Sequence, residues 1–210
     1  MSTKTELMRN VRDEVVNLIA SPLYEYRVSN HYHAVLGEGS HDAKIIFIGE
    51  APGRNEAKQG RPFCGAAGKI LDELLASIAV LREDVYITNI VKDRPPENRD
   101  PLPSEISAYG PFLDRQIDII QPNIIATLGR YSMNYIMKKF DLDFEIEPIS
   151  SAHGKVYEAE ASYGSISIVP LYHPAAAIYN QDLKAPLRED FQVLKDLLNR
   201  VPQTSTEDAS

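Results

Sequence analysis

Short apolar runs alternate along this chain with longer segments in which apolar residues recur every three or four positions. The short runs, which are rich in β-branched residues and bounded by Gly, Pro or Asn, are typical of strands buried on both faces. The recurring spacing is typical of amphipathic helices. The predicted strands are Ile45–Gly49, Val85–Val91, Ile124–Gly129 and Ser167–Tyr172, and the predicted helices are Glu6–Ile19, Ala67–Ile78, Ser104–Ile120, Arg130–Lys139 and Pro186–Leu198.

This alternation predicts the fold class, because strands joined through helices form parallel sheets that are covered on both faces. We predict an α/β fold, a three-layer α/β/α sandwich with a central four-stranded, mostly parallel sheet. Residues 1–201 are expected to form a single domain, on which residues 1–30 pack as an N-terminal helix and loop.

Three segments interrupt the alternation. Residues Ser21–Asp42 predict an irregular loop with a short strand at Ala34–Leu36. Residues Phe144–Tyr163 alternate in polarity and turn near Gly154, which predicts a hairpin or a loop insertion. The tail at residues 202–210 is polar and is predicted to be disordered.

The composition is that of an ordinary globular protein, with 43% hydrophobic and 25% charged residues. No run approaches the roughly 20 apolar residues of a membrane span, and the N-terminus lacks the apolar core of a signal peptide, so we expect a cytoplasmic monomer. The single cysteine, Cys64, excludes an internal disulfide and a cysteine-only metal cluster. The net charge of −8 argues against a surface that is basic all over, but it leaves room for a local cationic strip.

Unusual polar or glycine-rich segments follow three of the four predicted strands. They are Glu50–Gly68, Asn89–Arg99 and His173–Asn180. Because the carboxyl ends of parallel strands meet at one edge of a sheet, we expect these segments to line one cleft. The glycine spacing in the first segment fits neither a dinucleotide fingerprint nor a phosphate-binding P-loop.

Five short motifs resemble, in their order and spacing, those of the family 4 uracil-DNA glycosylases. They are Gly49–Gly53 (GEAPG), Gly60–Gly65 (GRPFCG), Thr88–Lys92 (TNIVK), Arg94–Pro96 (RPP) and His173–Ala175 (HPA). The similarity extends over roughly residues 35–198. It implies the uracil-DNA glycosylase fold and an enzyme of base excision repair that hydrolyses the N-glycosidic bond of flipped deoxyuridine, releasing uracil and leaving an abasic site.

The resemblance also implies roles for individual residues in holding the base. Phe63 would stack on the flipped uracil, and Asn89 would read its O4 and N3 edge. His173 would hydrogen-bond O2, where negative charge develops as the bond breaks. The backbone near Ala51 would help to bind the base.

Other positions are implied in placing water and gripping DNA. Glu56 and, less securely, Glu50 would position or activate the attacking water. The uracil-containing DNA, single- or double-stranded, would be contacted by Pro52, Gly53, Arg54, Arg61, Arg94, Ile178 and Tyr179, with Ile178 at the family's wedge position.

One departure from the family concerns its iron–sulfur cluster. The family usually holds a [4Fe–4S] cluster through four cysteines, two before the first strand, one in the loop after Asn89 and one in the next helix. Here Ser21–Ser29 contains no cysteine, Asp93 stands in the loop, and the helix offers residues such as Tyr109. We expect no metal and no cofactor, with packing that involves Tyr24, Tyr26 and Tyr109 in that corner.

Two alternative functions stay open. One is a uracil-DNA or single-strand binding protein with little or no turnover. The other is an unrelated α/β enzyme acting on a nucleotide or sugar phosphate. Release of uracil from an oligonucleotide separates both from a glycosylase.

Overall fold

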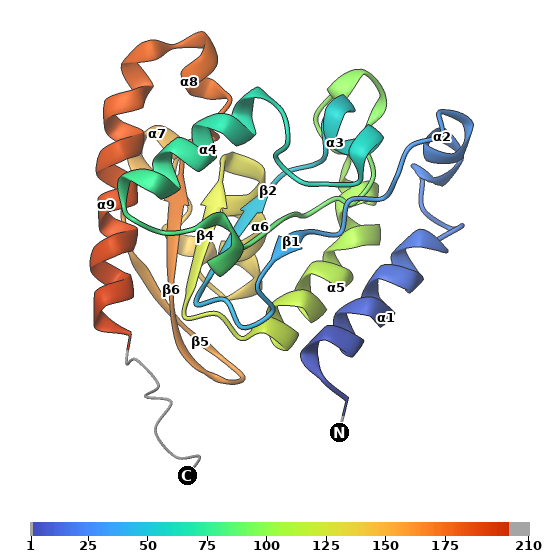
Figure 1. Ribbon diagram of the computed structural model, residues 1–210. Coiled ribbons are helices and arrows are strands. Elements are labelled where there is room, and N and C mark those ends of the chain that lie inside the picture. Colours follow the sequence, from blue (N-terminus) through green and yellow to red (C-terminus); the bar gives the residue numbers. More distant parts are fainter. Residues whose placement is uncertain (1, 202–210) are drawn as a thin grey trace.

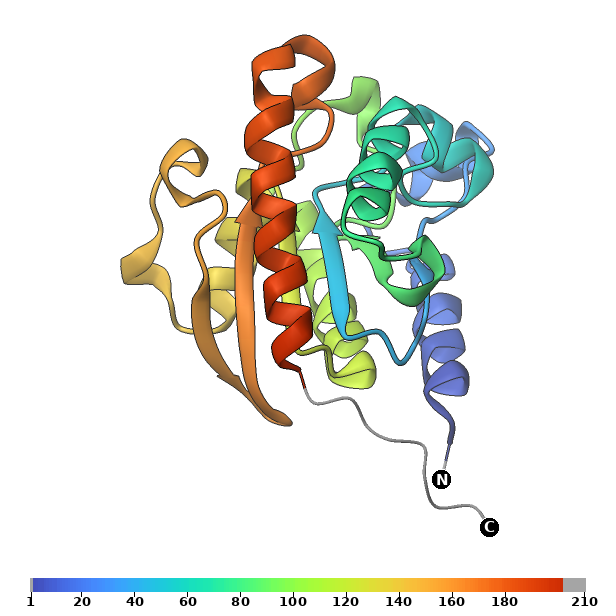
Figure 2. The ribbon, with the colours of Figure 1, turned by 60° about the vertical axis from the view of Figure 1, so that its left-hand side comes forward.

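The computed structural model describes residues 2–201, so the predicted disordered tail at residues 202–210 lies outside the described residues. A central sheet is covered by helices on both faces (Figures 1 and 2). The helices are α1 (Lys4–Val16), α2 (Tyr24–Ser29), α3 (Arg54–Gln59), α4 (Ala66–Ser77), α5 (Pro103–Ile120), α6 (Arg130–Lys139), α7 (Ile149–Ala152), α8 (Ala176–Tyr179) and α9 (Lys184–Arg200). The strands are β1 (Glu38–Gly39), β2 (Ile45–Gly49), β3 (Tyr86–Asn89), β4 (Ile124–Leu128), β5 (Tyr157–Ala161) and β6 (Gly164–Leu171).

The sheet has the strand order β1-β3-β2-β4-β6-β5. Its four inner strands are parallel, and both edge strands are antiparallel to their neighbours. The predicted three-layer architecture and parallel four-stranded centre are confirmed, and two antiparallel edge strands extend the sheet to six strands within the described residues.

Alternate residues of each inner strand enter different cores. Ile45 and Phe47 of β2 pack with residues of α4 and α9, whereas Ile46 and Ile48 pack with residues of α5 and α6. Figure 2 shows α9 lying along one face of the sheet. Because both faces are covered, the inner strands are mostly apolar, and this pattern allowed them to be predicted from the sequence.

Several local predictions are corrected by the structure. The short strand expected at Ala34–Leu36 is found instead at β1, and the hairpin expected within Phe144–Tyr163 is formed by β5 and β6, after the short helix α7. Helix α1 ends at Val16, so Ile19, the last residue of the predicted helix, lies beyond it and is 70% exposed.

The start of α5 also differs from the prediction. The N-cap is Leu102, not Ser104, and Pro103 occupies the first turn, where its missing N–H is not needed. The Glu105 carboxylate accepts a hydrogen bond from the Leu102 N–H at 2.8 Å.

The parallel centre places the ends of β2, β3, β4 and β6 at one edge of the sheet. In Figure 1 this edge lies at the top, with α8 and α3 above it, while the start of α1 and the end of α9 lie at the bottom. None of the helices described between residues 2 and 201 combines the length and apolarity needed to cross a membrane.

Candidate functional site

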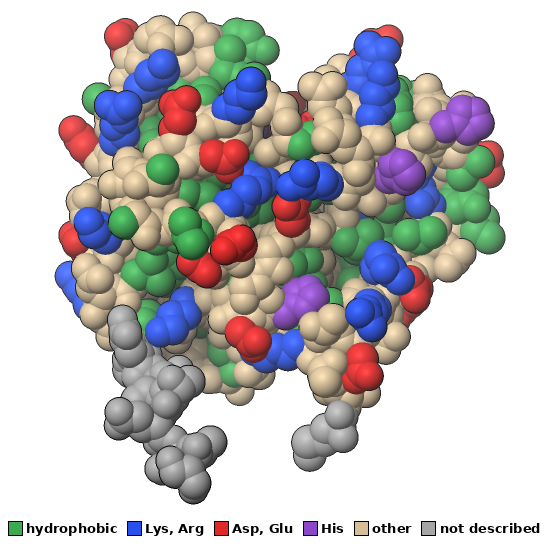
Figure 3. Space-filling view, viewed as in Figure 1, with side chains coloured by type: hydrophobic (Ala, Val, Ile, Leu, Met, Phe, Trp, Pro, Cys, Tyr) green, Lys and Arg blue, Asp and Glu red, His purple; other side chains and the backbone are tan. Residues whose placement is uncertain are grey.

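A pocket of about 410 Å³ opens at the carboxyl edge of the sheet. Figure 3 shows the surface hollowed at the top, between the side that carries α8 and the side that carries α3. The three polar segments predicted to converge do so here. The lining residues are Glu50, Ala51, Pro52, Gly53, Glu56, Phe63, Ala67, Asn89, Pro95, Asn98, Arg99, His173, Ala175 and Tyr179.

Two rings from different segments are stacked in the pocket wall. The centroids of the Phe63 and His173 rings lie 5.5 Å apart, with 28° between their planes. Phe63 has a left-handed backbone (φ 47°), a conformation that costs a non-glycine residue about 1–3 kcal/mol. A Cβ on Gly68 would lie 1.7 Å from the Phe63 carbonyl oxygen, so glycine there lets α4 approach this strained loop.

Asn89 ends β3 with its side chain almost completely buried, at 2% exposure. Within residues 2–201, its amide makes no hydrogen bond to another protein group, although it lines the pocket. A Cβ on Gly49 would lie 2.3 Å from Asn89 Oδ1, so glycine on the paired strand leaves room for this amide. Because the amide borders the pocket, a ligand bound there can supply its hydrogen bonds.

His173 is held as a neutral hydrogen-bond donor. Its Nδ1 accepts a hydrogen bond from the Ala175 N–H at 3.1 Å, so the ring hydrogen of the neutral form is on Nε2. Burial lowers the pKa of His173 to about 4, and the charge of Glu56 opposes this shift. The imidazole is therefore uncharged near neutral pH.

The two carboxylates of the pocket have different surroundings. Glu56 Oε1 accepts hydrogen bonds from the backbone N–H groups of Cys64 (3.1 Å) and Gly65 (3.0 Å), so it ties α3 to the loop before α4. Glu50 is half-buried, and burial raises its pKa to about 7; the charge of Asp100 adds to this shift and that of Arg130 opposes it. Glu50 is the carboxyl that exchanges a proton near neutral pH.

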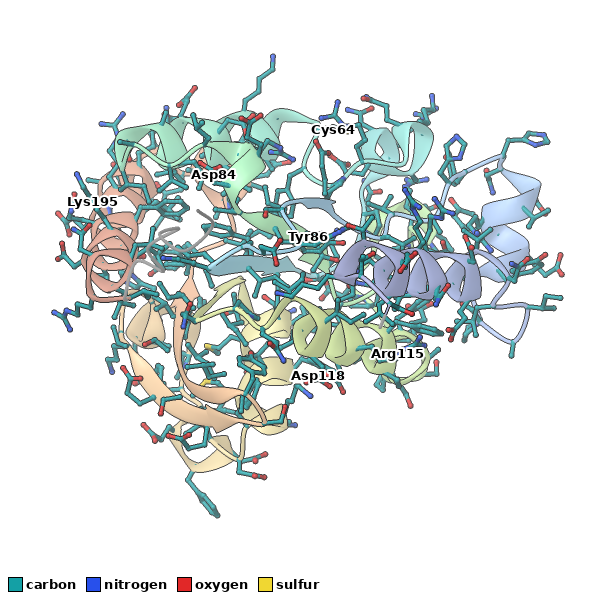
Figure 4. The ribbon with its side chains drawn as sticks, turned by 60° about the horizontal axis from the view of Figure 1, so that its bottom comes forward. Cys64, Asp84, Tyr86, Arg115, Asp118 and Lys195 are labelled. Carbon is teal, nitrogen blue, oxygen red and sulfur yellow. The ribbon has the colours of Figure 1, made fainter. Side chains whose placement is uncertain are left out.

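Cys64 lies on the loop before α4 and is labelled in Figure 4. Its Sγ is 3.7 Å from Glu56 Oε1. Burial, followed by the charge and hydrogen bond of Glu56, raises the pKa of the thiol. The protonated thiol is a poor nucleophile, which argues against a nucleophilic role for Cys64.

The residues expected to contact DNA lie in different environments. Pro52 and Gly53 line the pocket, and Arg54 is exposed in the first turn of α3. On α8, Ile178 is 39% and Tyr179 is 89% exposed.

Two of the expected arginine contacts are bound within the protein. Arg61 makes two hydrogen bonds to Glu38, at 2.9 and 2.6 Å. Arg94 is only 8% exposed and donates to Asn98 Oδ1 at 2.6 Å and to the hydroxyls of Tyr26 and Tyr32. These hydrogen bonds connect Arg94 to the loop of Pro95 to Asn98, and its expected contact with DNA stays a prediction.

The sequence reasoning missed Asn98 and Ala67 as pocket residues. Asn98 has a left-handed backbone (φ 55°), as does Glu97 before it (φ 56°). The sequence feature that could have marked Asn98 is that this turn-forming residue closely follows two prolines. Ala67, in the first turn of α4, carries no polar group that could have marked it.

A buried polar network fills the corner beside α1 and α2. The Tyr109 hydroxyl donates to Asp93 Oδ2 at 2.6 Å and lies 2.7 Å from Ser21 Oγ. Arg27 Nε lies 3.2 Å from the same carboxylate oxygen, and its guanidinium lies over the Tyr24 ring. Burial raises the pKa of Asp93, whereas Tyr109 and Arg27 oppose that shift. Polar contacts as well as aromatic packing therefore hold this corner.

No group of three or more His, Cys, Asp or Glu side chains within residues 2–201 is arranged to hold a metal ion.

Comparison with known proteins places this architecture and pocket in a family. The model of the uracil DNA glycosylase superfamily matches residues 36–195. A type-4 uracil-DNA glycosylase of Sulfurisphaera tokodaii is 47% identical over 90% of this chain and 84% of its own length. One from Archaeoglobus fulgidus is 47% identical over 81% of this chain and 84% of its own length. One from Thermotoga maritima is 38% identical over 95% of this chain and 99% of its own length.

With this sheet, this pocket and relatives that match over most of their length, the chain belongs to the type-4 uracil-DNA glycosylases of the uracil DNA glycosylase superfamily.

Proposed function

We propose that this pocket is where the protein, a uracil-DNA glycosylase, hydrolyses the N-glycosidic bond of deoxyuridine and releases uracil. The observation that supports this assignment is the side-chain amide of Asn89, which lines a pocket that also contains the stacked rings of Phe63 and His173. The reaction leaves an abasic site in DNA.

Asn89 accounts for the choice of base. An amide held in one orientation donates from Nδ2 to uracil O4 and accepts at Oδ1 from the uracil N3–H. Cytosine presents an amino donor and an N3 acceptor at these positions, so both groups of the amide would face unsuitable partners. Buried polar groups left unpaired in this way account for strong discrimination between bases.

His173 stabilises the leaving group. As the bond from N1 to C1′ breaks, negative charge builds on uracil O2, and the Nε2–H of the neutral imidazole donates to that oxygen. Because the pKa of His173 is near 4, the ring does not gain a proton from bulk water in the physiological range.

Glu50 is assigned to the attacking water. An acidic group acts as a base near neutral pH when its pKa is close to 7, as that of Glu50 is. One oxygen of Glu56 is already committed to two backbone N–H groups. We therefore assign activation of the attacking water to Glu50 and anchoring of the loop before α4 to Glu56. This assignment reverses the order of preference expected from the sequence, in which Glu56 came first.

Exposed residues of α8 engage the DNA. Flipping a nucleotide costs a few kcal/mol of lost stacking, and an apolar side chain inserted in the gap recovers part of it. Tyr179 lines the pocket, and Ile178 before it on α8 is also exposed, so the two present an aromatic and an apolar side chain to the DNA. Arg54 provides a cation for an adjacent phosphate.

An iron–sulfur cluster does not fit this chain. Such clusters are held by cysteine thiolates, and the only cysteine, Cys64, is in the pocket loop. The corner where the resemblance implies a cluster holds oxygen donors and a guanidinium. We propose that the network of Ser21, Tyr109, Asp93 and Arg27 supports this corner without a cofactor. Iron analysis of the purified protein should find no stoichiometric iron; one cluster per chain would overturn this proposal.

The assignment is tested with matched single- and double-stranded oligonucleotides that contain one uracil. Alkali should cleave the strand after incubation with the wild-type protein, and Asn89→Ala should lower the single-turnover rate by about 10²-fold or more. Asn123→Ala, an exposed asparagine before β4 at the other end of the sheet, should leave the rate unchanged. Tight binding without cleavage would instead favour a uracil-DNA binding protein.

A further inference from the structure

Lys92 is completely buried, with 0% of its surface exposed, just after the strand that ends in Asn89. Lysine is almost never buried to this degree unless it is paired. None of its three hydrogen-bond partners is a carboxylate. A buried cation without an anion is costly, and burial lowers the pKa of Lys92 well below its usual value. An apolar side chain of similar length would fill the same space without this cost.

The three hydrogen bonds of Lys92 identify the groups that its side chain holds in place. Lys92 Nζ donates to the Asn89 carbonyl oxygen at 2.6 Å, to Thr88 Oγ1 at 2.8 Å and to Gln116 Oε1 at 2.5 Å. The Lys92 side chain thus folds back toward the start of its own turn and is hydrogen-bonded to the backbone of Asn89.

Gln116 connects Lys92 to other parts of the fold. It is fully buried on α5, and its Nε2 donates to the Leu36 carbonyl oxygen at 2.9 Å and to the Tyr86 hydroxyl at 3.2 Å. Figure 4 labels Tyr86, which lies in the interior between the sheet and the helices. The turn that carries Asn89 is therefore tied to α5 through Lys92.

The same turn also reaches Glu50. The N–H groups of Ile90 and Val91 donate to the carbonyl oxygens of Gly49 and Glu50, both at 3.0 Å. Its geometry therefore sets the separation between the residue that reads the base and the residue assigned to the water.

We propose that Lys92 is a positioning residue, which acts on catalysis by holding the Asn89 backbone so that the amide meets the flipped base. This inference rests on the proposed role of Asn89. A displacement of about 1 Å in a positioned group costs roughly 10²-fold in rate, so loss of this grip should be visible kinetically.

A double-mutant cycle tests the proposal with single-turnover excision rates on the uracil oligonucleotide. Lys92→Met removes all three donors and keeps the length of the side chain. It should lower the rate by about 10- to 100-fold in the wild-type background and by less than threefold in the Asn89→Ala background. An equal loss in both backgrounds would overturn the proposal, because a general structural defect does not depend on Asn89.

Two further variants distinguish a specific effect of Lys92 from a general loss of stability or folding. Ile136→Ala, on the buried face of α6, should lower the melting temperature without a matching loss of rate. If Lys92→Met does not fold, Gln116→Met, which removes one acceptor, takes its place in the same cycle. A wild-type rate for Asn89→Ala would instead refute the role of Asn89, and so separates failure of the proposed function from failure of this inference.

Discussion

His173 and Glu50 show how burial acts in opposite directions on a base and an acid. Removal from water disfavours the charged form of each group, so the pKa of the imidazole falls to about 4 and that of the carboxyl rises to about 7. The result is a neutral hydrogen-bond donor beside a carboxyl that ionises near neutral pH. Both states suit hydrolysis of a glycosidic bond.

These two shifts predict the pH dependence of excision. Glu50 must be ionised to act as a base, so kcat/KM should be high above pH 7 and should fall as the pH drops through about 7. His173 titrates near 4 and contributes nothing to that decline. Measurement of kcat/KM between pH 5 and 9 checks the profile.

Two variants test whether the pH dependence near pH 7 comes from Glu50. Glu50→Gln should lose about 10²- to 10⁴-fold in rate and also the dependence near pH 7. Glu56→Gln should keep that dependence, since Glu56 holds the loop. An unchanged profile in Glu50→Gln would refute the assignment of the water to Glu50.

At the scale of elements, the start of α4 decides the position of Phe63. The helix comes so close to the preceding loop that a Cβ at Gly68 would overlap the Phe63 carbonyl, a backbone atom that has no rotamer to escape to. The C-terminal end of the same loop is held by Glu56 from α3. The stacking surface of the pocket is thus a product of two helices and not of Phe63 alone.

Gly68→Ala is predicted to lower both stability and activity. The added methyl group should cost about 1–3 kcal/mol of unfolding free energy through overpacking, and displacement of Phe63 should lower the excision rate. Urea unfolding and the oligonucleotide assay measure the two effects.

Gly164→Ala provides the comparison. Gly164 lies at the turn between β5 and β6 with a positive φ of 127°, and a Cβ added there would meet no atom within 4 Å. Its substitution should strain the backbone and lower stability while the rate of the folded protein stays the same. If Gly68→Ala behaved in the same way, the link between α4 and the pocket would be wrong.

At the scale of the whole molecule, the polar network joins distant parts of the chain. It connects Ser21 and Arg27 near α2 with Asp93 after β3 and Tyr109 on α5. The Arg115–Glu14 ion pair is an exposed link between α5 and α1, and Figure 4 labels Arg115. Exposed pairs contribute little, so the buried network is the stronger connection.

Arg27→Met is predicted to lower the unfolding free energy by about 3–5 kcal/mol, because it leaves the buried Asp93 carboxylate without its cation. Arg115→Met should cost about 0–1 kcal/mol. Urea unfolding compares the two variants.

The double variant Arg27→Met with Asp93→Leu should recover part of the loss, because it also removes the buried charge. A loss for Arg27→Met no larger than that for Arg115→Met would show that the network does not support this corner.

Local pattern was sufficient for most of the architecture. Buried parallel strands are apolar throughout and amphipathic helices repeat every three to four residues, so β2, β4, α4 and α6 were predicted close to their observed bounds. The edge strand β1 was misplaced, because a strand of two residues carries no periodicity.

The pattern of polarity along the chain was enough to predict the parallel centre of the sheet and the convergence of three loops, because the geometry of parallel strands requires no knowledge of distant contacts. Which charged side chains are buried depends on contacts between distant parts of the chain. Arg94 is buried by Tyr26 and Tyr32, which lie 68 and 62 residues away, and Lys92 is buried by Gln116, 24 residues away. A charged side chain is exposed or buried according to partners that the fold brings to it, and neighbouring residues in the sequence do not specify those partners.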